Sequence, residues 1–538
     1  MKKNGKRLAA ALCVVGLAGV SDATLERTAL GVEVANVATQ GVNDVEEESA
    51  LSGVATPERA GEPILIASDG SEIATKVTTL TVEGGASWER IVVGVSDVKL
   101  LKRLELRSGE LILGGVEIDG EQSGAAEFRL TPTDAANLAT VEIWAFASKN
   151  AGPGDKVKIA LKEAVAKGAD GKTAAFDAAS LEYRFGVLVR DSGWDGVAKY
   201  RIPGIVKTLN GTLIAVYDAR WKHAGDLPAD VDVACSRSFD GGKTWEPMQI
   251  VIDYDGPDPA KEGVGDPAIL VDPKTGRVWV AALWAHNGKS IHASQPGLKI
   301  GTSGRLVLSY SDDDGASWSE PVDITNVAAE GENWRILFQG PGCGIATRGG
   351  QLVFPAQFID ENGVWFSTLV WSGDGGKSWK AGNGAVKMTC EAQVVELNDG
   401  ALMLNMRNFE GRARSVALTR DFGETWEEHP TSKKALVEPI CQASLIRFSS
   451  TLDGDKSDLL AFMNPNSKSG RVEMTLKLSA DEGTTWDREL TLYRPGGWGY
   501  SSLVKIDDET IGALYETTGG LIFQTVKIED VPKVGDAK

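Results

Sequence analysis

One turn motif, repeated five times, restricts the possible folds of this chain more than any other feature. The motif is Ser/Thr-x-Asp-x-Gly-x-Ser/Thr-Trp, and we call it the Asp box. Its copies occupy residues 238–245, 311–318, 372–379, 419–426 and 479–486. Successive Trp residues of these copies are separated by 73, 61, 47 and 60 residues. This spacing is typical of one four-stranded propeller blade with its loops.

The residue types of the Asp box indicate a structural role. The Asp carboxylate can accept backbone N–H groups of its own turn, and the Gly can adopt a positive φ without steric cost. The Trp ring can fill the space between neighbouring sheets. The acidic run at 312–314 lacks the alternating ligands and the terminal Glu of a calcium loop, so we assign no calcium to it. The boxes therefore predict hairpins and hold none of the chemistry.

The boxes lie in the C-terminal part of a 538-residue chain, which is long enough for two domains. Residues 188–532 divide naturally into six blades of about 57 residues. Residues 63–187 show short alternating runs between Gly- and Asp-containing turns, with one short helix expected at 131–139. We therefore expect an all-β chain, a six-bladed β-propeller preceded by a smaller β-sandwich. That sandwich has either a carbohydrate-binding role or a purely packing role.

The N-terminus has the composition of an export signal. Four basic residues among the first seven precede an apolar run at 8–20, which is too short to span a bilayer. Ser21 and Ala23 provide the small residues of a cleavage site, so we interpret residues 1–23 as a signal peptide. Residues 24–62 are acidic and without a clear period, and we interpret them as a flexible lead. Export to the periplasm or the extracellular space is therefore expected.

Several function classes find no support in the sequence. Neither a GxSxG elbow, a Walker A motif nor a dinucleotide fingerprint is present, and the four His residues lack metal-site spacing. The cysteines of the predicted mature chain show no CxxC pair, which favours buried free thiols over disulfides; they are Cys235, Cys343, Cys390 and Cys441. We therefore expect no cofactor and no metal.

The net charge of −19 restricts the partners of the chain. Because no basic stripe is present, neither nucleic acid nor an anionic membrane is an expected partner. An anionic substrate would have to be captured at short range by a local cationic pocket.

The tetrapeptide at 200–203, Tyr-Arg-Ile-Pro, followed by five Asp boxes, resembles the bacterial sialidase (neuraminidase) family over about 340 residues. The family consists of retaining exo-glycosidases, so the resemblance implies hydrolysis of terminal α-linked sialic acids on glycoproteins, glycolipids or oligosaccharides. It also implies three arginines that hold the carboxylate of the sugar, matched here by Arg201, Arg407 and Arg471. Arginine suits this task because its planar guanidinium binds a carboxylate through two hydrogen bonds.

The resemblance also implies the catalytic groups. Tyr500 matches the family nucleophile, and Glu391 matches the residue that takes its proton. A neutral phenol suits an anomeric carbon that bears a carboxylate, because an anionic nucleophile would be repelled. Asp226 matches the acid/base, which protonates the leaving oxygen and then activates water. Asp230 and Asp232 lie close enough in sequence to be confused with Asp226, and a mobile or partly apolar loop would help to keep the acid protonated.

Further residues match positions that contact the sugar in this family. Arg220 and Asp266 match the pair at the O4 hydroxyl, with a structural ion pair near the pocket as the alternative. An apolar pocket for the N-acetyl group would be lined by Trp284, Phe338 or Trp365, among which the sequence does not choose.

Two other functions use many of the same residues. A trans-sialidase would form the same covalent intermediate and resolve it with an acceptor instead of water, on an aromatic platform that the sequence does not identify. A non-catalytic propeller that binds sialoglycans or protein partners would share the Asp boxes. The complete set of Arg, Tyr, Glu and Asp residues argues against this binding role.

Overall fold

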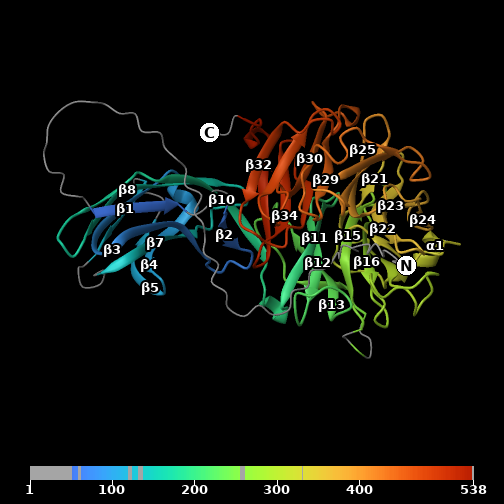
Figure 1. The fold of residues 1–538 in the computed structure, drawn as a ribbon, viewed down its shortest axis with the longest axis horizontal. Coiled ribbons are helices and arrows are strands. Elements are labelled where there is room, and N and C mark those ends of the chain that lie inside the picture. The colour runs from blue at the N-terminus through green and yellow to red at the C-terminus, as the bar shows by residue number, and fades with distance from the viewer. Residues whose placement is uncertain are drawn as a thin grey trace, which may run out of the picture.

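The computed structural model describes residues 51–57, 62–118, 124–130, 137–254, 258, 261–329 and 331–535. These residues form strands, with one short α-helix, α1 (Thr325–Ala328), so the prediction of an all-β chain is confirmed. Figure 1 shows a propeller on the right and a smaller β region on the left. The predicted signal peptide lies outside the described residues. None of the described helices has the length and hydropathy needed to cross a membrane.

Five separate sheets follow one another along the chain and form propeller blades (Figure 1). The first contains β11 (Lys199–Lys207), β12 (Leu213–Arg220), β13 (Val231–Ser238) and β14 (Gln249–Ile252). The second contains β15 (Val264–Val271), β16 (Val278–Trp284), β17 (Arg305–Ser311), β18 (Val322–Asp323) and β20 (Gly342–Cys343). The third contains β19 (Ile336–Gln339), β21 (Ile345–Ala346), β22 (Leu352–Ile359), β23 (Trp365–Ser372) and β24 (Lys380–Ala381).

The fourth and fifth blades have four strands each. The fourth contains β25 (Thr389–Glu396), β26 (Leu402–Asn408), β27 (Ser415–Thr419) and β28 (Glu427–Glu428). The fifth contains β29 (Ser444–Ser449), β30 (Leu459–Pro465), β31 (Met474–Ser479) and β32 (Arg488–Tyr493). The strands that open the first, second, fourth and fifth blades, β11, β15, β25 and β29, are mostly buried, so these strands can bring side chains from distant parts of the sequence to one axis.

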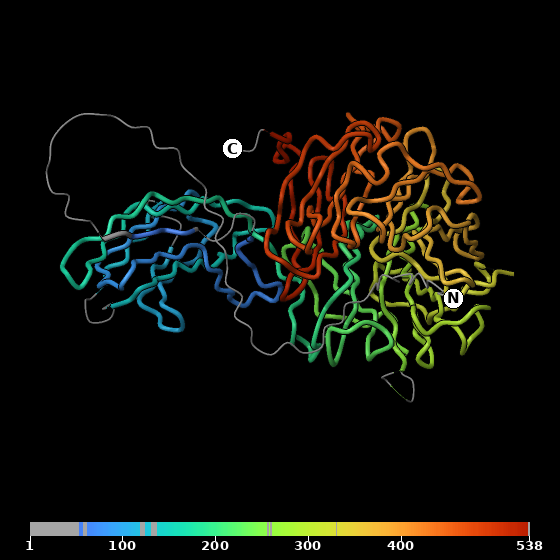
Figure 2. The backbone as a smooth tube through the Cα atoms, viewed as in Figure 1, coloured from blue at the N-terminus to red at the C-terminus, as the bar shows by residue number. Residues whose placement is uncertain are grey.

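The C-terminal strands join the two ends of the propeller to the smaller region. They are β33 (Ser501–Lys505), β34 (Thr510–Glu516) and β35 (Leu521–Lys527). The last of them pairs antiparallel with the second half of β10 (Ser180–Arg190), whose first half pairs with β8 (Lys156–Lys167). The boundary that we predicted near residue 187 therefore falls within one continuous strand, which passes between the two regions in Figure 2.

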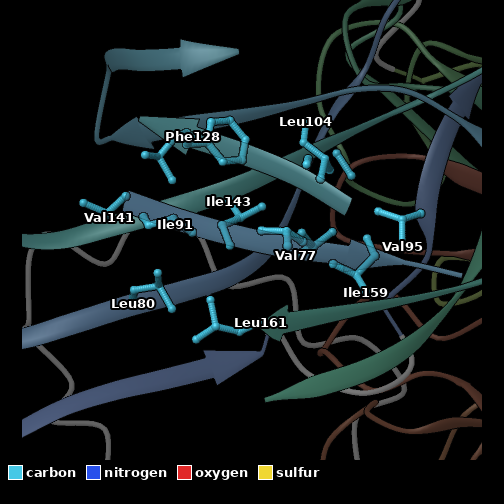
Figure 3. Packing of buried hydrophobic residues seen from close by; sticks show 14 of the residues in the cluster. Val77, Leu80, Ile91, Val95, Leu104, Phe128, Val141, Ile143, Ile159 and Leu161 are labelled. Carbon is cyan, nitrogen blue, oxygen red and sulfur yellow. The ribbon is translucent and has the colours of Figure 1, made fainter. Parts of the chain in front are cut away.

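The smaller region is built around one long strand, β3 (Ala74–Val95). Its other strands are β8 with β1 (Leu51–Pro57), β4 (Leu101–Ser108), β5 (Leu111–Glu117), β6 (Ala125–Arg129), β7 (Leu138–Ala147) and β9 (Ala174–Phe176), whereas β2 (Ile64–Ala67) pairs parallel with the second half of β10. The first half of β3 pairs with β7 and the second half with β8. Alternate residues point into a shared apolar core, shown in Figure 3 with Leu80, Ile91 and Ile143 among its members.

Of two expectations for this part of the chain, the flexible lead needs correction, and the short helix falls mostly outside the described residues. Strand β1 lies within the segment 24–62 that we interpreted as a flexible lead, and it pairs antiparallel with β3 and parallel with β9. No period is visible in this segment because β1 is short and pairs with β3 and β9, which lie later in the chain. Of the helix expected at 131–139, residues 131–136 lie outside the described residues, and Leu138 and Ala139 begin β7.

The Asp boxes adopt the conformation that their residue types predict. Each box begins at the last residue of a strand of its blade, and these strands are β13, β17, β23, β27 and β31. In all five, the Asp accepts a hydrogen bond of 2.8–3.0 Å from the backbone N–H four residues later. The box glycines have φ values from 77 to 92°, where a side chain would be strained.

The box tryptophans connect neighbouring sheets, as predicted. Trp245 of the first box packs edge-on against Phe523 of β35, with ring centroids 5.4 Å apart. Trp379 of the third box contacts Trp279 of β16 in the preceding blade at 5.8 Å. Trp426 of the fourth box donates from its indole nitrogen to the carbonyl of Asn383 across 3.0 Å. These contacts set each hairpin against the blade before it.

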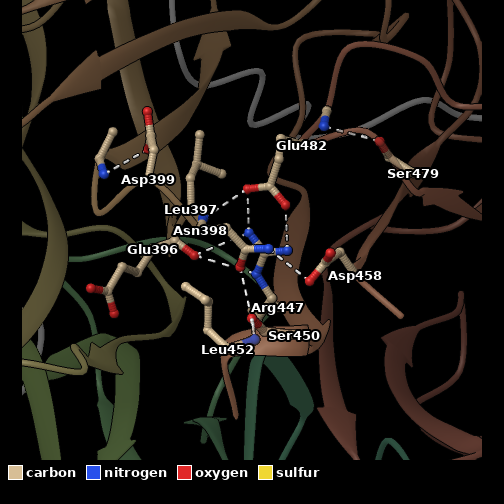
Figure 4. Close-up of polar contacts among 12 residues, drawn as sticks. Glu396, Leu397, Asn398, Asp399, Arg447, Ser450, Leu452, Asp458, Ser479 and Glu482 are labelled. Atoms are coloured by element: carbon tan, nitrogen blue, oxygen red, sulfur yellow. Dashed lines mark hydrogen bonds and ion pairs between the residues drawn. The ribbon is translucent and has the colours of Figure 1, made fainter. Parts of the chain in front are cut away.

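An ion pair adds a further connection between the fourth and fifth blades (Figure 4). Arg447 of β29 donates two hydrogen bonds, of 2.7 and 2.6 Å, to the carboxylate of Glu482 in the fifth box. Glu482 also accepts the backbone N–H of Asn398, which follows β25 in the fourth blade, across 3.0 Å. The fifth Asp box therefore forms a turn within its own blade and also binds the neighbouring fourth blade.

Candidate active site

All eight residues predicted for the site line one cavity of about 490 Å³. They are Arg201, Arg220, Asp226, Asp266, Glu391, Arg407, Arg471 and Tyr500. They come from β11, β12, β15, β25 and β26, from two loops, and from the residue that precedes β33. The propeller therefore brings together side chains that are up to 300 positions apart, and the local cationic pocket expected of an acidic chain is present.

The predicted nucleophile is held by a carboxylate and a guanidinium. The hydroxyl of Tyr500 donates a hydrogen bond to Oε1 of Glu391. Arg407 donates from one terminal nitrogen to Oε2 of Glu391 across 2.6 Å and to the Tyr500 oxygen across 3.1 Å. Burial and the Glu391 carboxylate raise the pKa of Tyr500 well above its usual value, while Arg407 and Arg471 act in the opposite direction. The phenol is therefore neutral in this state, with a proton acceptor already in contact.

Arg201 is positioned by a buried carboxylate that our sequence reasoning did not identify. Nε of Arg201 donates to Oε1 of Glu516 across 2.9 Å. The same carboxylate accepts the backbone N–H of Ile202 across 2.8 Å and that of Tyr500 across 2.9 Å. Glu516 ends β34 and is almost completely buried, so it ties the first arginine of the site to the backbone of the predicted nucleophile.

A second buried ion pair supports the other side of the site. Arg414 and Glu438 are both fully buried, and their charged groups lie 2.9 Å apart. Glu438 accepts the backbone N–H of Asn408, next to Arg407, across 2.7 Å. Arg414 donates to the carbonyl of Cys441, which packs against Tyr500, across 2.7 Å. The pair was not anticipated from the sequence either, where each residue resembles a surface charge.

Asp226 lies in the cavity, in contact with cations. Its Oδ1 is 2.7 Å from a terminal nitrogen of Arg220 and 4.0 Å from one of Arg201. Burial acts to raise the pKa of Asp226, but the charges of Arg220 and Arg201 outweigh it and hold the pKa below its usual range. This corrects the expectation that the loop keeps Asp226 protonated, because the carboxyl is ionised while the arginines are unoccupied.

The two alternatives to Asp226 lie elsewhere. Asp230 forms an ion pair with Lys222 at 3.0 Å, and Asp232 accepts a hydrogen bond from the indole nitrogen of Trp221 across 2.7 Å. Neither of them is among the residues that line the cavity. The geometry therefore favours Asp226.

Arg220 and Asp266 meet around a third carboxylate, Asp218. Nε and a terminal nitrogen of Arg220 lie 3.1 and 2.8 Å from Oδ2 of Asp218, whose Oδ1 accepts the backbone N–H of Asp266 across 2.8 Å. Burial raises the pKa of both Asp218 and Asp266. The structural ion pair that we considered for Arg220 is thus made with Asp218, while Arg220 and Asp266 both face the cavity.

One of the three aromatic candidates for the N-acetyl pocket reaches the cavity. Trp365 lines it, together with Ile291, His292 and Leu227. Phe338 is buried beneath this group, and Trp284 stacks on Tyr254 with ring centroids 4.2 Å apart. The cavity therefore has a cationic side and an apolar side.

Cysteines and metal ligands were also part of our expectations. Within the described residues, all four cysteines are buried and none forms a disulfide, as predicted. In that same part of the chain, no group of three His, Cys, Asp or Glu side chains is arranged to hold a metal ion.

Comparisons with known proteins agree with this geometry. The family model described as BNR repeat-like domain matches residues 202–516. A sialidase of Bacteroides fragilis is 47% identical over 376 residues, which cover 68% of this chain and 69% of the relative. A sialidase of Micromonospora viridifaciens is 32% identical over 339 residues, 61% of this chain and 52% of that longer protein. The solved structure of the Hadza microbial sialidase Hz136 has a TM-score of 0.80 at 33% identity, and the match covers 89% of this chain and 100% of that one.

These matches span most of the propeller, and the residues that carried the resemblance converge on one cavity within it. The chain belongs to the sialidase family and is a glycoside hydrolase, an exo-α-sialidase.

Proposed function

We propose that this sialidase hydrolyses terminal α-linked sialic acids of glycoconjugates with retention of configuration, through a covalent intermediate on Tyr500. The observation that carries the proposal is the contact of the Tyr500 hydroxyl with both Glu391 and Arg407, in a cavity that also holds three further arginines and Asp226. The substrates would be sialylated glycoproteins, glycolipids and oligosaccharides.

Substrate capture is assigned to Arg201, Arg407 and Arg471. A carboxylate on the anomeric carbon offers two oxygens, and guanidinium groups bind such a group with defined geometry. Arg220 and Asp266 are assigned to the O4 hydroxyl, since both line the cavity. Trp365 and Ile291 are assigned to the N-acetyl group, because they form the apolar lining.

In the first step the Tyr500 oxygen forms a bond to the anomeric carbon, and the glycosidic C–O bond breaks. The phenol proton passes to Glu391, which already accepts its hydrogen bond. A proton on Asp226 passes to the leaving oxygen. In the second step Asp226 takes a proton from water, the water oxygen bonds to the anomeric carbon, the bond from that carbon to the Tyr500 oxygen breaks, and the released phenolate regains its proton from Glu391. Two displacements at one carbon give net retention.

Binding of the substrate supports the protonation of Asp226 that this step requires. The cations Arg220, Arg201 and Arg471 lower the pKa of this carboxyl in the free protein. The carboxylate of the sugar compensates part of that positive charge when it binds. We therefore expect the pKa of Asp226 to rise on binding, which favours the protonated acid in the complex.

We also infer the remaining parts of the architecture. Strands β33–β35 with the second half of β10 have the connectivity of a sixth blade, closed by one strand from the N-terminal side. The two sets of pairings along β3, around one apolar core, support a β-sandwich domain at 63–187 that begins as early as β1. Export of the protein remains a proposal from the sequence of residues 1–23.

The experiment is product analysis by NMR with an α-sialyllactose, combined with Tyr500→Phe. Retention predicts that the α-anomer of free sialic acid appears first. Tyr500→Phe should lose most turnover, whereas Tyr310→Phe, which alters a tyrosine on β17 that does not line the cavity, should retain it. Full activity of Tyr500→Phe, or initial release of the β-anomer, would overturn the mechanism.

A further inference from the structure

We infer that Trp498 is a positioning residue that orients two of the site arginines, Arg201 and Arg471, for the substrate carboxylate. The inference rests on the proposed function, in which these arginines bind that carboxylate. Trp498 lines the cavity and lies two residues before Tyr500.

Arg201 is restrained by Trp498 on one face. The central carbon of its guanidinium lies 4.4 Å from the centroid of the Trp498 ring, a distance at which a cation is attracted to an aromatic face. Glu516 holds the Nε edge of the same group at 2.9 Å. Because the Trp498 ring contacts one face of the guanidinium and Glu516 contacts one edge, these two residues restrain the orientation of the guanidinium plane. Of its terminal nitrogens, Nη2 donates to Oε2 of Glu516 across 3.4 Å and Nη1 lies 4.0 Å from Asp226.

Arg471 is restrained by the backbone of the same segment. A terminal nitrogen of Arg471 donates to the carbonyl of Trp498 across 2.8 Å, and the backbone N–H of Gly497 donates to the carbonyl of Arg471 across 3.1 Å. Arg471 lies in the connection between β30 and β31, so no strand pairing fixes it. The turn at 497–499 therefore holds an arginine that would otherwise depend on a loop.

The glycine after Trp498 allows this close approach. Gly499 has φ of 83°, and a Cβ there would lie 3.0 Å from side-chain atoms of Arg471 and of Pro465. The tight turn thus brings the Trp498 carbonyl to one arginine and its ring to the other. Trp498 therefore contacts both of the groups that must bind the same carboxylate, and the Tyr500 ring lies 5.2 and 5.5 Å from the same two guanidinium carbons.

This arrangement predicts a defined kinetic effect. The carboxylate is bound in the ground state and in the transition state alike, so loss of its orientation raises KM more than it lowers kcat. A side-chain substitution leaves the backbone carbonyl in place and therefore tests the restraint on Arg201 alone. We expect Trp498→Leu to raise KM about tenfold with kcat within about threefold, and Trp498→Phe, which keeps an aromatic face, to stay within about threefold in both.

The control is Trp371→Leu. Trp371 lies on β23, away from the cavity; the Lys380 nitrogen lies 5.6 Å from the centroid of its ring, and the ring stacks on Phe422. This variant should keep the KM of the unaltered enzyme. A second measurement compares the inhibition constants of 2-deoxy-2,3-didehydro-N-acetylneuraminic acid and its methyl ester. Trp498→Leu should weaken the acid several-fold and leave the neutral ester unchanged, because only the acid depends on the oriented arginines.

An unchanged KM and an unchanged acid-to-ester ratio in Trp498→Leu would overturn the inference. An equal loss for acid and ester would also overturn it, since it would indicate general damage to the cavity. Either result, obtained while Tyr500→Phe is inactive, would leave the proposed function intact. Activity in Tyr500→Phe would refute that function separately.

Discussion

The hydroxyl of Tyr500 donates a hydrogen bond to Glu391, which lies 109 positions earlier in the sequence. Glu391 is in turn held by Arg407, whose nitrogen lies 2.6 Å from its second oxygen. Because the pKa of Tyr500 is raised by burial and by Glu391, the phenol does not ionise in advance of the reaction. In the mechanism that we propose, loss of this proton accompanies the attack of Tyr500, so we expect the carboxylate that receives the proton to control the rate.

Glu391→Gln removes that acceptor while it preserves the size of the side chain. We expect kcat to fall by about 10²–10⁴-fold, the usual contribution of a positioned base. Steady-state kinetics with an aryl sialoside will measure it. Glu396→Gln, at the other end of β25, is the matched control and should leave kcat unchanged. A Glu391→Gln enzyme with undiminished kcat would show that the proton goes elsewhere.

Asp226→Asn should affect substrates according to their leaving groups. Sialyllactose releases an alcohol, which needs a proton from the acid, whereas a nitrophenyl sialoside releases an acidic phenol that does not. We expect kcat/KM for sialyllactose to fall by about 10²–10⁴-fold and kcat/KM for the nitrophenyl sialoside to fall much less. Asp230→Asn should resemble the unaltered enzyme on both substrates, since Asp230 pairs with Lys222 outside the cavity. Equal losses on both substrates would contradict the acid role.

Sequence reasoning was most successful where local chemistry decides the structure. The Asp box is a short turn whose Asp, Gly and Trp each satisfy a nearby requirement, so its conformation could be predicted from the motif. The site residues could be proposed only through resemblance, because no local pattern shows that Arg201 and Tyr500 share a cavity. The structure brings them together through the propeller axis.

Several features that escaped prediction depend on contacts over long sequence distances. Glu516 resembles any acidic residue at the end of a strand, yet it meets Arg201, 315 positions earlier. Trp498 lies two residues before Tyr500 in the sequence. Its contact with Arg201, however, depends on how the last strands pack against the first blade. Strand β1 was missed for the same reason, since its partners β3 and β9 are remote in the chain.

The Asp boxes should make the stability of the protein sensitive to acid. Hydrogen bonds from Ser378 and Thr425 lower the pKa values of Asp374 and Asp421 to about 2, from an ordinary value of 3.8. A carboxyl with a lowered folded pKa stabilises the fold above its unfolded pKa, and this stabilisation is lost as the pH falls through the folded value. We therefore expect the melting temperature to fall between about pH 4 and pH 2.

Thermal unfolding followed by circular dichroism from pH 2 to pH 6 will test this. The double variant Asp374→Asn/Asp421→Asn should melt lower at pH 6 and should show a smaller decline through the acidic window. Asp177→Asn, at an exposed position after β9, should follow the profile of the unaltered protein. A double variant with the same acid-dependent decline as the unaltered protein would show that the box carboxylates do not cause it.

Glu516→Gln should damage both stability and substrate capture. The two oxygens of Glu516 accept hydrogen bonds from Arg201, from the backbone N–H of Ile202 and from that of Tyr500. The Gln side chain has an NH2 group in place of one carboxylate oxygen, so one of these N–H groups would lose its acceptor. The charge of Arg201 would also be left without its buried partner. Removal of one member of a buried ion pair costs about 3–5 kcal/mol, so the melting temperature should fall by several degrees.

The kinetic effect of Glu516→Gln should appear in both parameters. KM should rise because Arg201 loses its orientation, and kcat should fall because the backbone at Tyr500 is no longer held against Glu391. Glu509→Gln, an exposed change near the start of the same strand β34, controls for the loss of a negative charge and should alter neither. A Glu516→Gln protein that melts normally and keeps its KM would mean that Arg201 is oriented by other contacts, of which the ring of Trp498 is the nearest on its face.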